Sequence, residues 1–523
     1  MVTLDPFGYS ESDTLAKPRR KFSAVGNSLH LKSKELTIWN LLLIREKKPF
    51  DSLLVKESER LIRSQRYIRR VKITPRMISR ESDSVDVDIR VLDSWSLVPN
   101  FAGSTNRMTF MLTERNFMGF GHQVDNTYRR DNELKANAYS VKYTIPNVMN
   151  TYIRTTLNYD IDLVDNYAKS IDIERPFFSP FARWGGGVFI GKQFKRDSLP
   201  DITGDLNLQP FNFSTTDVWG GHAINIFDGL SEDERTTNLI TTARVMNINY
   251  RDRPDDLHDP VHFFDDELLV LTGIGVASRQ FVEDKYLFNY GIIEDVPTGT
   301  VVGITGGYQD KNSIRRPYIG FRASTGKYFR YGYISSNFEY GTFVRSGSSE
   351  QGAVSLQTNY FTKLIEIGSW KLRQFAKAQI IIGNNRVASE GDYLTLNEAE
   401  QGISGFNSRS LFGTKKWLTT FQTQSYSPWN AWGFRLNPFF NYTMGMVGNA
   451  ENGFNNSRLY SQLGIGVIIS NDYLVFSTFQ LSFSFYPVIP EQGTGIFKTN
   501  ALKTDDFGFQ DFSLNKPRTV FYE

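Results

Sequence analysis

The segment at residues 139–145, YSVKYTI, places an apolar or aromatic side chain at every second position and a polar one between them. A period of two is typical of a β-strand whose two faces meet different surroundings. The same alternation recurs at residues 153–159, 432–444 and 479–485. From about residue 101 to the C-terminus, the sequence therefore predicts a series of strands, each with one apolar and one polar face.

Two architectures contain strands of this kind, a soluble sandwich and a transmembrane barrel. Sandwich strands commonly have about five or six residues and share a thin core. Many segments here run for about ten residues, and their apolar positions are rich in Tyr, Phe and Trp, as in a membrane barrel with an apolar outside and a polar lumen. We therefore expect residues 101–523 to form a transmembrane antiparallel β-barrel of about 16 strands.

The composition excludes several other classes of protein. Of the 523 residues, 40% are hydrophobic and 14% aromatic, and no run of about 18 apolar residues is present to form a membrane-spanning helix. The 59 basic and 56 acidic residues nearly balance, so we expect no nucleic-acid partner. The absence of cysteine excludes disulfide, thiolate-zinc and iron–sulfur chemistry. Residues 1–10, MVTLDPFGYS, lack the regions of a signal peptide, so an export signal is expected upstream or of another kind.

The N-terminal part of the chain has a different pattern. Residues 1–34 are polar and basic, which predicts an arm or linker. Residues 35–98 predict a compact unit with a strand at 38–44, a helical stretch capped by Asp51, and strands at 67–73 and 83–91. The order strand, helix, helix, strand, strand is that of a small α+β domain whose helices cover one face of the sheet.

Three segments resemble a known family, the BamA/TamA-like outer-membrane protein assembly superfamily. Residues 35–98 look like its POTRA domain, a periplasmic module that precedes the barrel. The segment ERNFMGFG at 114–121 resembles the turn that joins the first two barrel strands, through Asn116, Phe117, Gly119 and Gly121. The segment Ile403-Ser404-Gly405-Phe406 resembles the valine-arginine-glycine-phenylalanine motif at the tip of a loop folded into the lumen, here around residues 386–416.

The chain departs from the family at the two residues that form a lumenal ion pair. Ser404 stands at the position of the family's arginine, and Thr443, in Thr443-Met444-Gly445, stands at the position of its aspartate. Loss of both charges together is close to neutral, because two hydroxyls need only a modest hydrogen bond or a water. Arg409, in the same loop, is a candidate for a replacement charge.

The resemblance implies a function at the seam of the barrel. In the family, the seam between the first strand, here near residues 107–113, and the last, near 507–520, is weakly paired and can template an incoming strand. The chain would lie in the bacterial outer membrane, with residues 1–98 in the periplasm, and assist insertion or translocation of other outer-membrane proteins. Its partners would be the lipid bilayer with lipopolysaccharide, client outer-membrane proteins, and periplasmic or lipoprotein partners at the POTRA-like domain.

Two alternatives stand beside this function. One is a barrel of the same fold that acts as a channel or as a structural subunit of a larger complex. The other is a metal site in RPDDLHDPVHFFDDE at 253–267, where His258 and His262 are four residues apart. That spacing brings two imidazoles together only on a helix, and Pro254 and Pro260 argue against a helix. We therefore expect an acidic loop, no catalytic residue, no metal and no cofactor.

Overall fold

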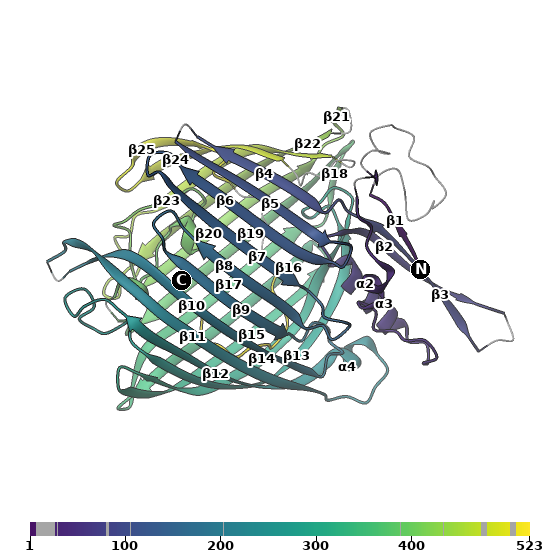
Figure 1. The fold of residues 1–523 in the computed structure, drawn as a ribbon, viewed down its shortest axis with the longest axis horizontal. Helices are drawn as coiled ribbons and strands as arrows, with labels where there is room; N and C mark the ends of the chain where they lie inside the picture. The colour runs from purple at the N-terminus through teal and green to yellow at the C-terminus, as the bar shows by residue number, and fades with distance from the viewer. Residues whose placement is uncertain are drawn as a thin grey trace.

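The computed structural model describes residues 1–6, 27–28, 30–79, 83–104, 106–201, 203–387, 389–431, 434–471, 479–502 and 509–522. Most of these residues lie in one large antiparallel sheet that curls into a barrel, with a small α/β unit at one end (Figure 1). We call the barrel end beside this unit the near end and the opposite end the far end. None of the helices in the described ranges is long and apolar enough to cross a membrane.

The α/β unit contains three strands and two helices. These are β1 (Val2–Leu4), α2 (Glu35–Trp39), α3 (Ser52–Arg63), β2 (Ile68–Met77) and β3 (Val85–Asp93). The strands lie in the order β1-β3-β2, with β1 parallel and β2 antiparallel to β3. Buried residues of both helices and of β2 and β3 form one apolar core between the helices and the sheet.

The first strand of this unit does not lie where the sequence predicts it. The predicted strand at 38–44 overlaps α2 and the turn after it, and its place in the sheet is taken by β1, within the predicted arm at 1–34. Ile38, Leu41 and Leu42 are buried together, because a spacing of three and four residues puts them on one side of a helical turn. Residues 7–26 and 29 of the predicted arm lie outside the described residues.

The barrel is formed by β4 to β25, with one short helix among them. Its first strands are β4 (Leu97–Gly103), β5 (Arg107–Phe117), β6 (His122–Asp131), β7 (Ala136–Ile145), β8 (Arg154–Ile161), β9 (Tyr167–Arg175), β10 (Trp184–Pro200) and β11 (Leu206–Asn225). After α4 (Glu232–Thr236) follow β12 (Thr237–Asp252), β13 (Glu267–Lys285), β14 (Ile293–Lys311), β15 (Ile314–Phe329), β16 (Gly332–Arg345), β17 (Ser348–Thr362), β18 (Ile365–Ile367) and β19 (Trp370–Asn384). The last are β20 (Lys415–Tyr426), β21 (Asn430–Ala431), β22 (Phe434–Gly448), β23 (Tyr460–Asn471), β24 (Phe479–Ile489) and β25 (Gly493–Thr499).

The sheet is larger than the sequence predicts. The short segment β18 pairs with β19, which also pairs with β17, and the short segment β21 pairs with β22, which also pairs with β20. When β18 and β21 are not counted separately, the barrel has twenty strands within the described residues, more than the expected number of about 16. It also begins at Leu97, inside the predicted 35–98 unit and before the expected start at residue 101.

Burial alternates along the barrel strands in the way that the sequence predicts. On β13, Ile274 and Val276 are exposed on the outside, whereas Leu271 and Ala277 are buried on the lumenal side. Arg279 of the same strand is charged and buried, and it shares the lumenal side with Leu271 and Ala277. An apolar outside and a partly polar inside is the arrangement of a barrel that lies in lipid.

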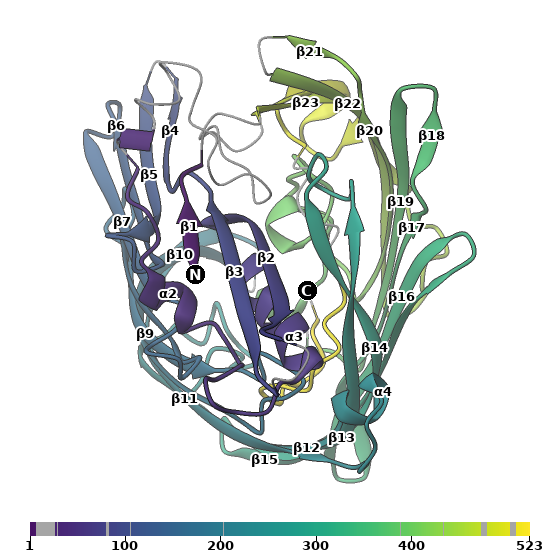
Figure 2. The same cartoon turned by 90° about the vertical axis from the view of Figure 1, so that its right-hand side faces the viewer.

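The structure differs from the prediction at both edges of the sheet. The predicted first strand, 107–113, lies in β5, and β4 precedes it. Residues 507 and 508 of the predicted last strand lie outside the described residues, and residues 509–522 form no strand. They run inside the ring of strands instead, at the yellow end of the chain (Figure 2).

The first and last strands of the sheet are therefore β4 and β25. They follow each other in the strand order around the barrel. In the part of the chain that the structure describes, and with β18 and β21 not counted separately, a backbone register joins all neighbouring barrel strands except one pair. Within these residues, no register joins β25 to β4. This pair is the seam of the barrel.

Candidate functional site

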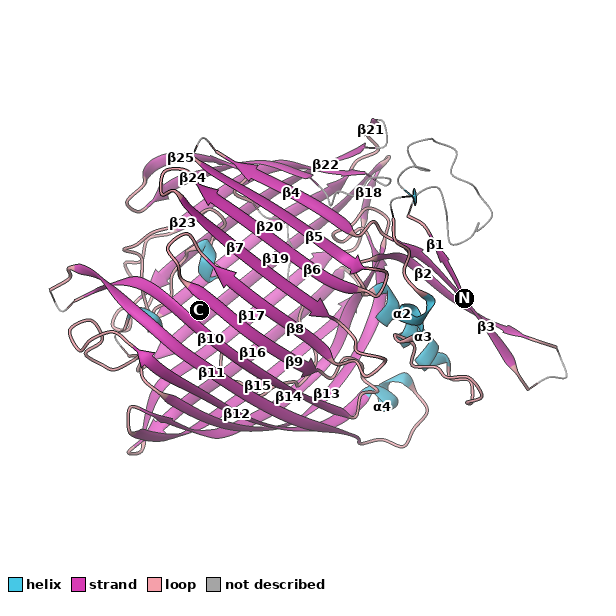
Figure 3. Cartoon of the chain, in the orientation of Figure 1, coloured by secondary structure: helices cyan, strands magenta, loops and turns pink. Residues whose placement is uncertain are grey.

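The loop between β19 and β20 folds into the lumen from the far end. It contains two helical turns, η1 (Glu390–Asp392) and η2 (Glu398–Glu400), which lie within the outline of the barrel, away from α2 and α3 (Figure 3). Leu396, Ile403 and Phe406 of this loop are buried. They pack with wall residues of β20 to β24: Leu418, Val447, Tyr460, Tyr486 and Ile489. The loop at 385–414 is therefore fixed to the wall by an apolar cluster, and its position matches the inward fold predicted around 386–416.

Gly405 is at the tip of this loop and is held by strands next to the seam. Its N–H donates to Glu398 Oε2 at 2.8 Å, and its carbonyl accepts from Lys498 Nζ of β25 at 2.7 Å. The carbonyl of Ser404 accepts a hydrogen bond from the Tyr486 hydroxyl of β24. Gly405 has a φ of +70°, and a Cβ there would overlap the Tyr486 hydroxyl. Only glycine fits this left-handed turn without displacing the wall.

Ser404 and Thr443 lie in the lumen but do not pair. Thr443 is buried on the lumenal face of β22, where its hydroxyl lies 3.1 Å from Asn441 Oδ1 and 3.1 Å from the Thr420 hydroxyl. Among the described residues no hydrogen bond joins Ser404 to Thr443. Thr443 therefore lies on the lumenal face of β22 and bonds to its neighbours on β20 and β22 rather than to Ser404.

The other two candidate residues, Gly445 and Arg409, lie at different places, Gly445 on β22 and Arg409 in the loop at 385–414. A Cβ at Gly445 would lie 3.0 Å from Leu396 Cδ2, so glycine lets the loop approach β22 closely at this point. Arg409 is exposed, and its backbone N–H donates to Glu491 Oε2, in the turn between β24 and β25, at 3.0 Å. Arg409 thus lies at the β24–β25 turn and supplies no charge to Thr443.

Two lysines that the sequence analysis did not single out bind the loop instead. Lys498 holds the tip, as described above. Lys416 of β20 is fully buried, and its Nζ donates to the Glu400 carbonyl at 2.9 Å. The sequence does contain a signal for the position of Lys498. Phe497 faces outward, and because neighbouring residues of a strand face opposite sides, the ammonium group of Lys498 faces the lumen.

The turn motif at 114–121 joins the barrel to the α/β unit. It connects β5 to β6, which are the second and third strands rather than the first two. Asn116 is buried; its Oδ1 accepts from the Gly121 N–H at 2.7 Å, and its Nδ2 donates to the Ser33 hydroxyl at 3.0 Å. The carboxamide therefore closes the turn and ties it to the α/β unit with the same side chain.

The two glycines of this motif allow the unit to approach. Gly119 and Gly121 have φ angles of 76° and 72°, and a Cβ at Gly121 would lie 2.6 Å from the Tyr67 hydroxyl oxygen. The Gly119 carbonyl accepts from the Lys34 N–H at 2.9 Å. Phe117 is exposed and makes no part of this contact. The motif is thus a docking turn for the α/β unit.

Helix α3 is held against the near end by ion pairs. Asp51 accepts from the N–H groups of Leu53 and Leu54 at 3.0 and 3.4 Å, as the predicted cap of α3. The same carboxylate accepts two hydrogen bonds from Arg235 of α4, at 2.6 and 3.1 Å. The hydrogen bond from Arg235 holds the pKa of the Asp51 carboxyl below its ordinary value, against the opposing effect of burial.

Docking of α3 should therefore weaken in acid through Asp51. Because the folded pKa is lowered, the ion pair contributes fully above the ordinary pKa of aspartate, about 4, and its contribution is lost as pH falls through the lowered value. D51N removes the charge but keeps the cap, and we expect a loss of about 1 kcal/mol at neutral pH and no further loss in acid from this pair. D51A removes the cap as well and should cost about 1 kcal/mol more.

The measurement for this prediction is hydrogen–deuterium exchange of α3 between pH 7 and pH 3. Wild-type protection, corrected for the intrinsic exchange rate, should fall below about pH 4, and D51N should remove that step. An equal step in D51N would show that another carboxyl is responsible.

The acidic segment 253–267 lies between β12 and β13. His258 Nδ1 is 2.6 Å from Asp255 Oδ1, and the Asp259 carboxylate accepts from the N–H groups of Phe263 and Phe264 at 2.8 Å. These contacts stabilise the segment as a loop. Within the described residues, no group of three or more His, Asp or Glu side chains is arranged to hold a metal ion.

Comparisons with known proteins give matches among solved structures only. No protein-family model matches the sequence, and no curated protein matches it. The chain is similar to BamA from Haemophilus ducreyi lacking POTRA domains 1-3, with 12% identity and a TM-score of 0.35 over 90% of this chain and 81% of that one. It is similar to CdiB from Acinetobacter baumannii, with 9% identity and a TM-score of 0.40 over 90% and 71% of the two chains, and to CdiB from Escherichia coli, with 10% identity and a TM-score of 0.43 over 89% and 73%. All three TM-scores are below 0.5, and at this level of likeness the matches transfer no function to this chain.

Proposed function

We propose that the protein is a bacterial outer-membrane barrel that assists the insertion or translocation of other outer-membrane proteins at the seam between β4 and β25. The α/β unit would be a POTRA-like domain, and residues 1–98 would lie in the periplasm. The single observation that carries the proposal is the seam itself. β25 and β4 are neighbours in the closed strand order, yet within the described residues β25 has a backbone register with β24 and β4 has one with β5, and none joins β25 to β4.

The strands at the seam are short. β4 and β25 have seven residues each, whereas β13 and β14 have nineteen. Seven residues at about 3.3 Å each span roughly 23 Å, and a tilt of about 45° reduces this to roughly 16 Å of a hydrocarbon core about 30 Å thick. Backbone groups that are unpaired there find no water, so a client strand that pairs with this edge would be stabilised.

Side chains at the seam fit the same role. Phe101 of β4 and Phe497 of β25 are 58% and 77% exposed, which offers apolar surface to lipid or to a client strand. Pro99 lies within β4, and proline, which has no N–H to donate, is tolerated in a sheet mainly at an edge. Both features support a seam that pairs weakly with its neighbour.

The partners of such a protein follow from the same chemistry. The bilayer with its lipopolysaccharide would surround the apolar outside, and client outer-membrane proteins would pair at the seam. β2 is an edge strand of the α/β unit, and this edge would be the place where periplasmic or lipoprotein partners dock. No catalytic residue and no cofactor are required, because the client's own burial and hydrogen bonding supply the driving force.

A channel or a structural subunit of a larger complex is the second candidate. The missing hydrogen bond between Ser404 and Thr443, noted above for the described residues, favours it, because the lumenal pair of the family has no counterpart there. The channel form is the weaker of the two, because the loop at 385–414 and the segment at 509–522 both occupy the lumen.

A disulfide across the seam should abolish the assembly activity. The chain has no cysteine, so a cysteine at Phe101 can be combined in turn with one at Phe497 or Thr499, and the pair that oxidises is used. Liposomes that contain the reduced protein should accelerate folding of a reporter barrel, because an open edge can template its strands. Oxidation should return the rate to that of empty liposomes, and reductant should restore it.

The matched control is a disulfide between Phe110 and Tyr128, which are register partners on β5 and β6. This control should fold the reporter at the wild-type rate in both redox states. Full activity of the locked seam would contradict the proposal. If the reduced protein fails to accelerate folding, the structural-subunit candidate takes its place.

A further inference from the structure

Residues 509–522, which we call the tail, cross the lumen on the wall formed by β11 to β19. Phe509 packs with Tyr333 and Phe361 toward the near end, and the Tyr522 hydroxyl donates to the Thr414 carbonyl of the lumenal loop at 3.0 Å. The tail contains no strand, so no backbone ladder holds it to the sheet. Side chains of the wall must supply its binding.

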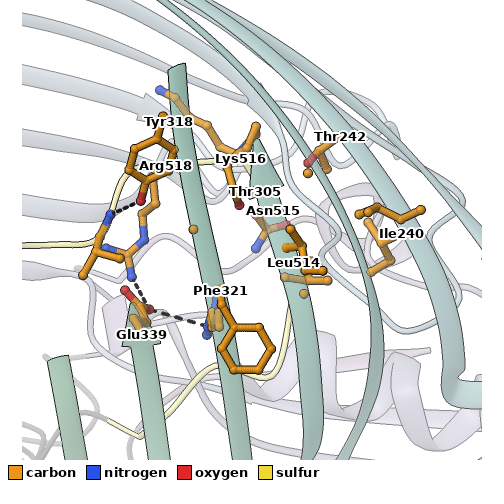
Figure 4. Close-up of a pocket in the computed structure, with 18 residues that line it drawn as sticks. Ile240, Thr242, Thr305, Tyr318, Phe321, Glu339, Leu514, Asn515, Lys516 and Arg518 are labelled. Atoms are coloured by element: carbon orange, nitrogen blue, oxygen red, sulfur yellow. Dashed lines mark hydrogen bonds and ion pairs between the residues drawn. The ribbon is translucent and has the colours of Figure 1, made fainter. Parts of the chain in front are cut away.

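The tail is extended, and alternate side chains face the wall. These are Phe512, Leu514, Lys516, Arg518, Val520 and Tyr522. Figure 4 shows Leu514, Lys516 and Arg518 among Thr242, Tyr318 and Glu339 of the wall strands. A period of two over eleven residues is the repeat of an extended peptide bound along one face.

Glycines in the wall accept the apolar side chains of the tail. A Cβ at Gly275 would lie 2.6 Å from Leu514 Cδ1, and one at Gly303 would lie 3.2 Å from Leu514 Cδ2. These two glycines are register partners on β13 and β14, so together they form one recess. Phe512 fits in the same way over Gly326 and is fully buried. The wall is therefore shaped for apolar side chains two residues apart.

Carboxylates in the wall bind the two basic side chains that follow. Arg518 donates to Glu339 Oε1 at 2.8 Å, and Lys516 forms an ion pair with Asp217. The side chains of Asp217 and Glu339 are only 5% and 6% exposed. Asp217 also accepts two hydrogen bonds from Arg244 at 2.9 Å, and Glu339 lies 3.6 Å from Arg322. Lys516 and Arg518 therefore add a second cation to each buried carboxylate, and an acidic residue at either position would be disfavoured.

The wall also binds the backbone of the tail, through four hydrogen bonds. These are Arg322 to the carbonyls of Asp511 (2.9 Å) and Ser513 (3.3 Å), Arg244 to the Pro517 carbonyl (3.1 Å) and the Val520 N–H to the Tyr318 hydroxyl (2.9 Å). Bonds to main-chain groups recognise an extended chain whatever its side chains are. Arg244 and Tyr318 thus fix the path of the chain, while the glycine recesses and the carboxylates select its residues.

We infer that this wall is a peptide-binding track for an extended segment with apolar residues two apart, followed by basic residues four and six positions after the first of them. The tail is its resident ligand, and a peptide of the same pattern supplied in trans can replace it. The inference concerns the lumen and stands independently of the seam.

A disulfide can lock the tail in the track. A Cβ at Gly273 would lie 3.6 Å from Pro517 Cβ, within the separation of about 3.5–4.5 Å that a disulfide requires. Full-length G273C/P517C in nanodiscs is tested with the fluorescein-labelled peptide FQDFSLNKPRTVFY, the sequence of 509–522. We expect binding to the reduced protein and none to the oxidised protein. Equal binding in both states would overturn the inference, because the peptide would then bind elsewhere.

A second full-length variant leaves the wall unchanged and weakens the tail. K516E/R518E puts two carboxylates of the tail against Asp217 and Glu339, so the tail should leave the track and the labelled peptide should bind at least about tenfold more tightly than to wild type. The same peptide with both basic residues replaced by glutamate should not bind. Disulfide yield in G273C/P517C/K516E/R518E reports the position of the tail independently of the peptide.

Two results would contradict the track. One is a tail that still forms the disulfide with wild-type yield after charge reversal, since the carboxylates would then not hold it. The other is a released tail without any gain in peptide affinity, since the freed wall would then have no affinity for the pattern.

Discussion

Replacement of Arg63 by methionine should release the α/β unit from the near end of the barrel. The Arg63 side chain is 8% exposed and forms ion pairs with three carboxylates, Asp295 at 2.9 Å, Glu283 at 2.7 Å and Glu59 at 3.3 Å. Burial raises the pKa of the Glu59 carboxyl even with this cation beside it. R63M would leave three carboxylates close together without the arginine that binds all of them, and breaking a buried pair in this way costs about 3–5 kcal/mol. The docked population should therefore fall by more than about a hundredfold relative to the undocked one.

Spin labels report this release directly, because the chain has no native cysteine. Cysteines at the exposed residues Met77 of β2 and Tyr331 of the β15–β16 turn carry the labels. Wild type should give one narrow distance distribution, and R63M a broad one. Lowering the pH of R63M toward about 4 should narrow the distribution again in part, because protonated carboxyls no longer repel one another.

The control for R63M is K56M on the same helix. Lys56 pairs with Glu232 at 2.8 Å, but its side chain is 50% exposed, and an exposed pair contributes about 0–1 kcal/mol. K56M should keep the narrow distribution. A narrow distribution in R63M as well would mean that the remaining contacts, the turn at Asn116 and the Asp51–Arg235 pair, hold the unit without Arg63.

The sequence predicts the inner strands of the sheet well and its two edge strands poorly, for one physical reason. Alternation along Tyr139 to Ile145 indicates that the two faces of an extended chain meet different surroundings, and these residues lie in β7, whose faces do differ. Residues 512–522 alternate in the same manner, yet they lie on the lumenal wall without a ladder. The period of two records burial and not a hydrogen-bond partner, so a last strand and a bound tail look alike in sequence.

In the α/β unit, the apolar pattern of the sequence does not distinguish a strand from a helical turn. Residues 38–44 are almost uniformly apolar, and an apolar run of that length fits a strand or a buried helical turn equally well. The capping carboxylate of Asp51 is a local interaction and was predictable from its position. The strand β1 was not, because it pairs in parallel with β3, which follows it by more than eighty residues.

At the lumenal loop, the motif locates the site but does not identify its bonds. The apolar Ile403 and Phe406 pack against the wall, and Gly405 adopts a left-handed turn that favours glycine. Among the bonds to the loop, those from Tyr486, Lys498 and Lys416 come from three separate strands. Their arrangement depends on the curvature of the sheet, which one sequence does not specify.

Replacement of Phe406 by alanine should detach the loop at 385–414 from the wall. Phe406 is 1% exposed and packs with Leu396, Tyr460 and Tyr486; its ring lies 5.5 Å from that of Tyr460 in an edge-on arrangement. Loss of a buried phenylalanine costs about 3–5 kcal/mol. Backbone bonds within the loop, such as the Ile403 N–H to the Leu396 carbonyl at 2.9 Å, do not tie it to the wall and cannot offset this loss.

Hydrogen–deuterium exchange measures this detachment. In F406A, amides at 394–408 should exchange more than about a hundredfold faster than in wild type, while those of β13 to β17 keep their protection. F412A is the matched control in the same loop, because Phe412 is 38% exposed and should cost little. Amides of β25 should also exchange faster in F406A but not in F412A, since Lys498 loses the Gly405 carbonyl when the tip leaves. Unchanged protection in F406A would show that the polar bonds alone hold the loop, whereas faster exchange at 394–408 with an unaffected β25 would separate the loop from the seam.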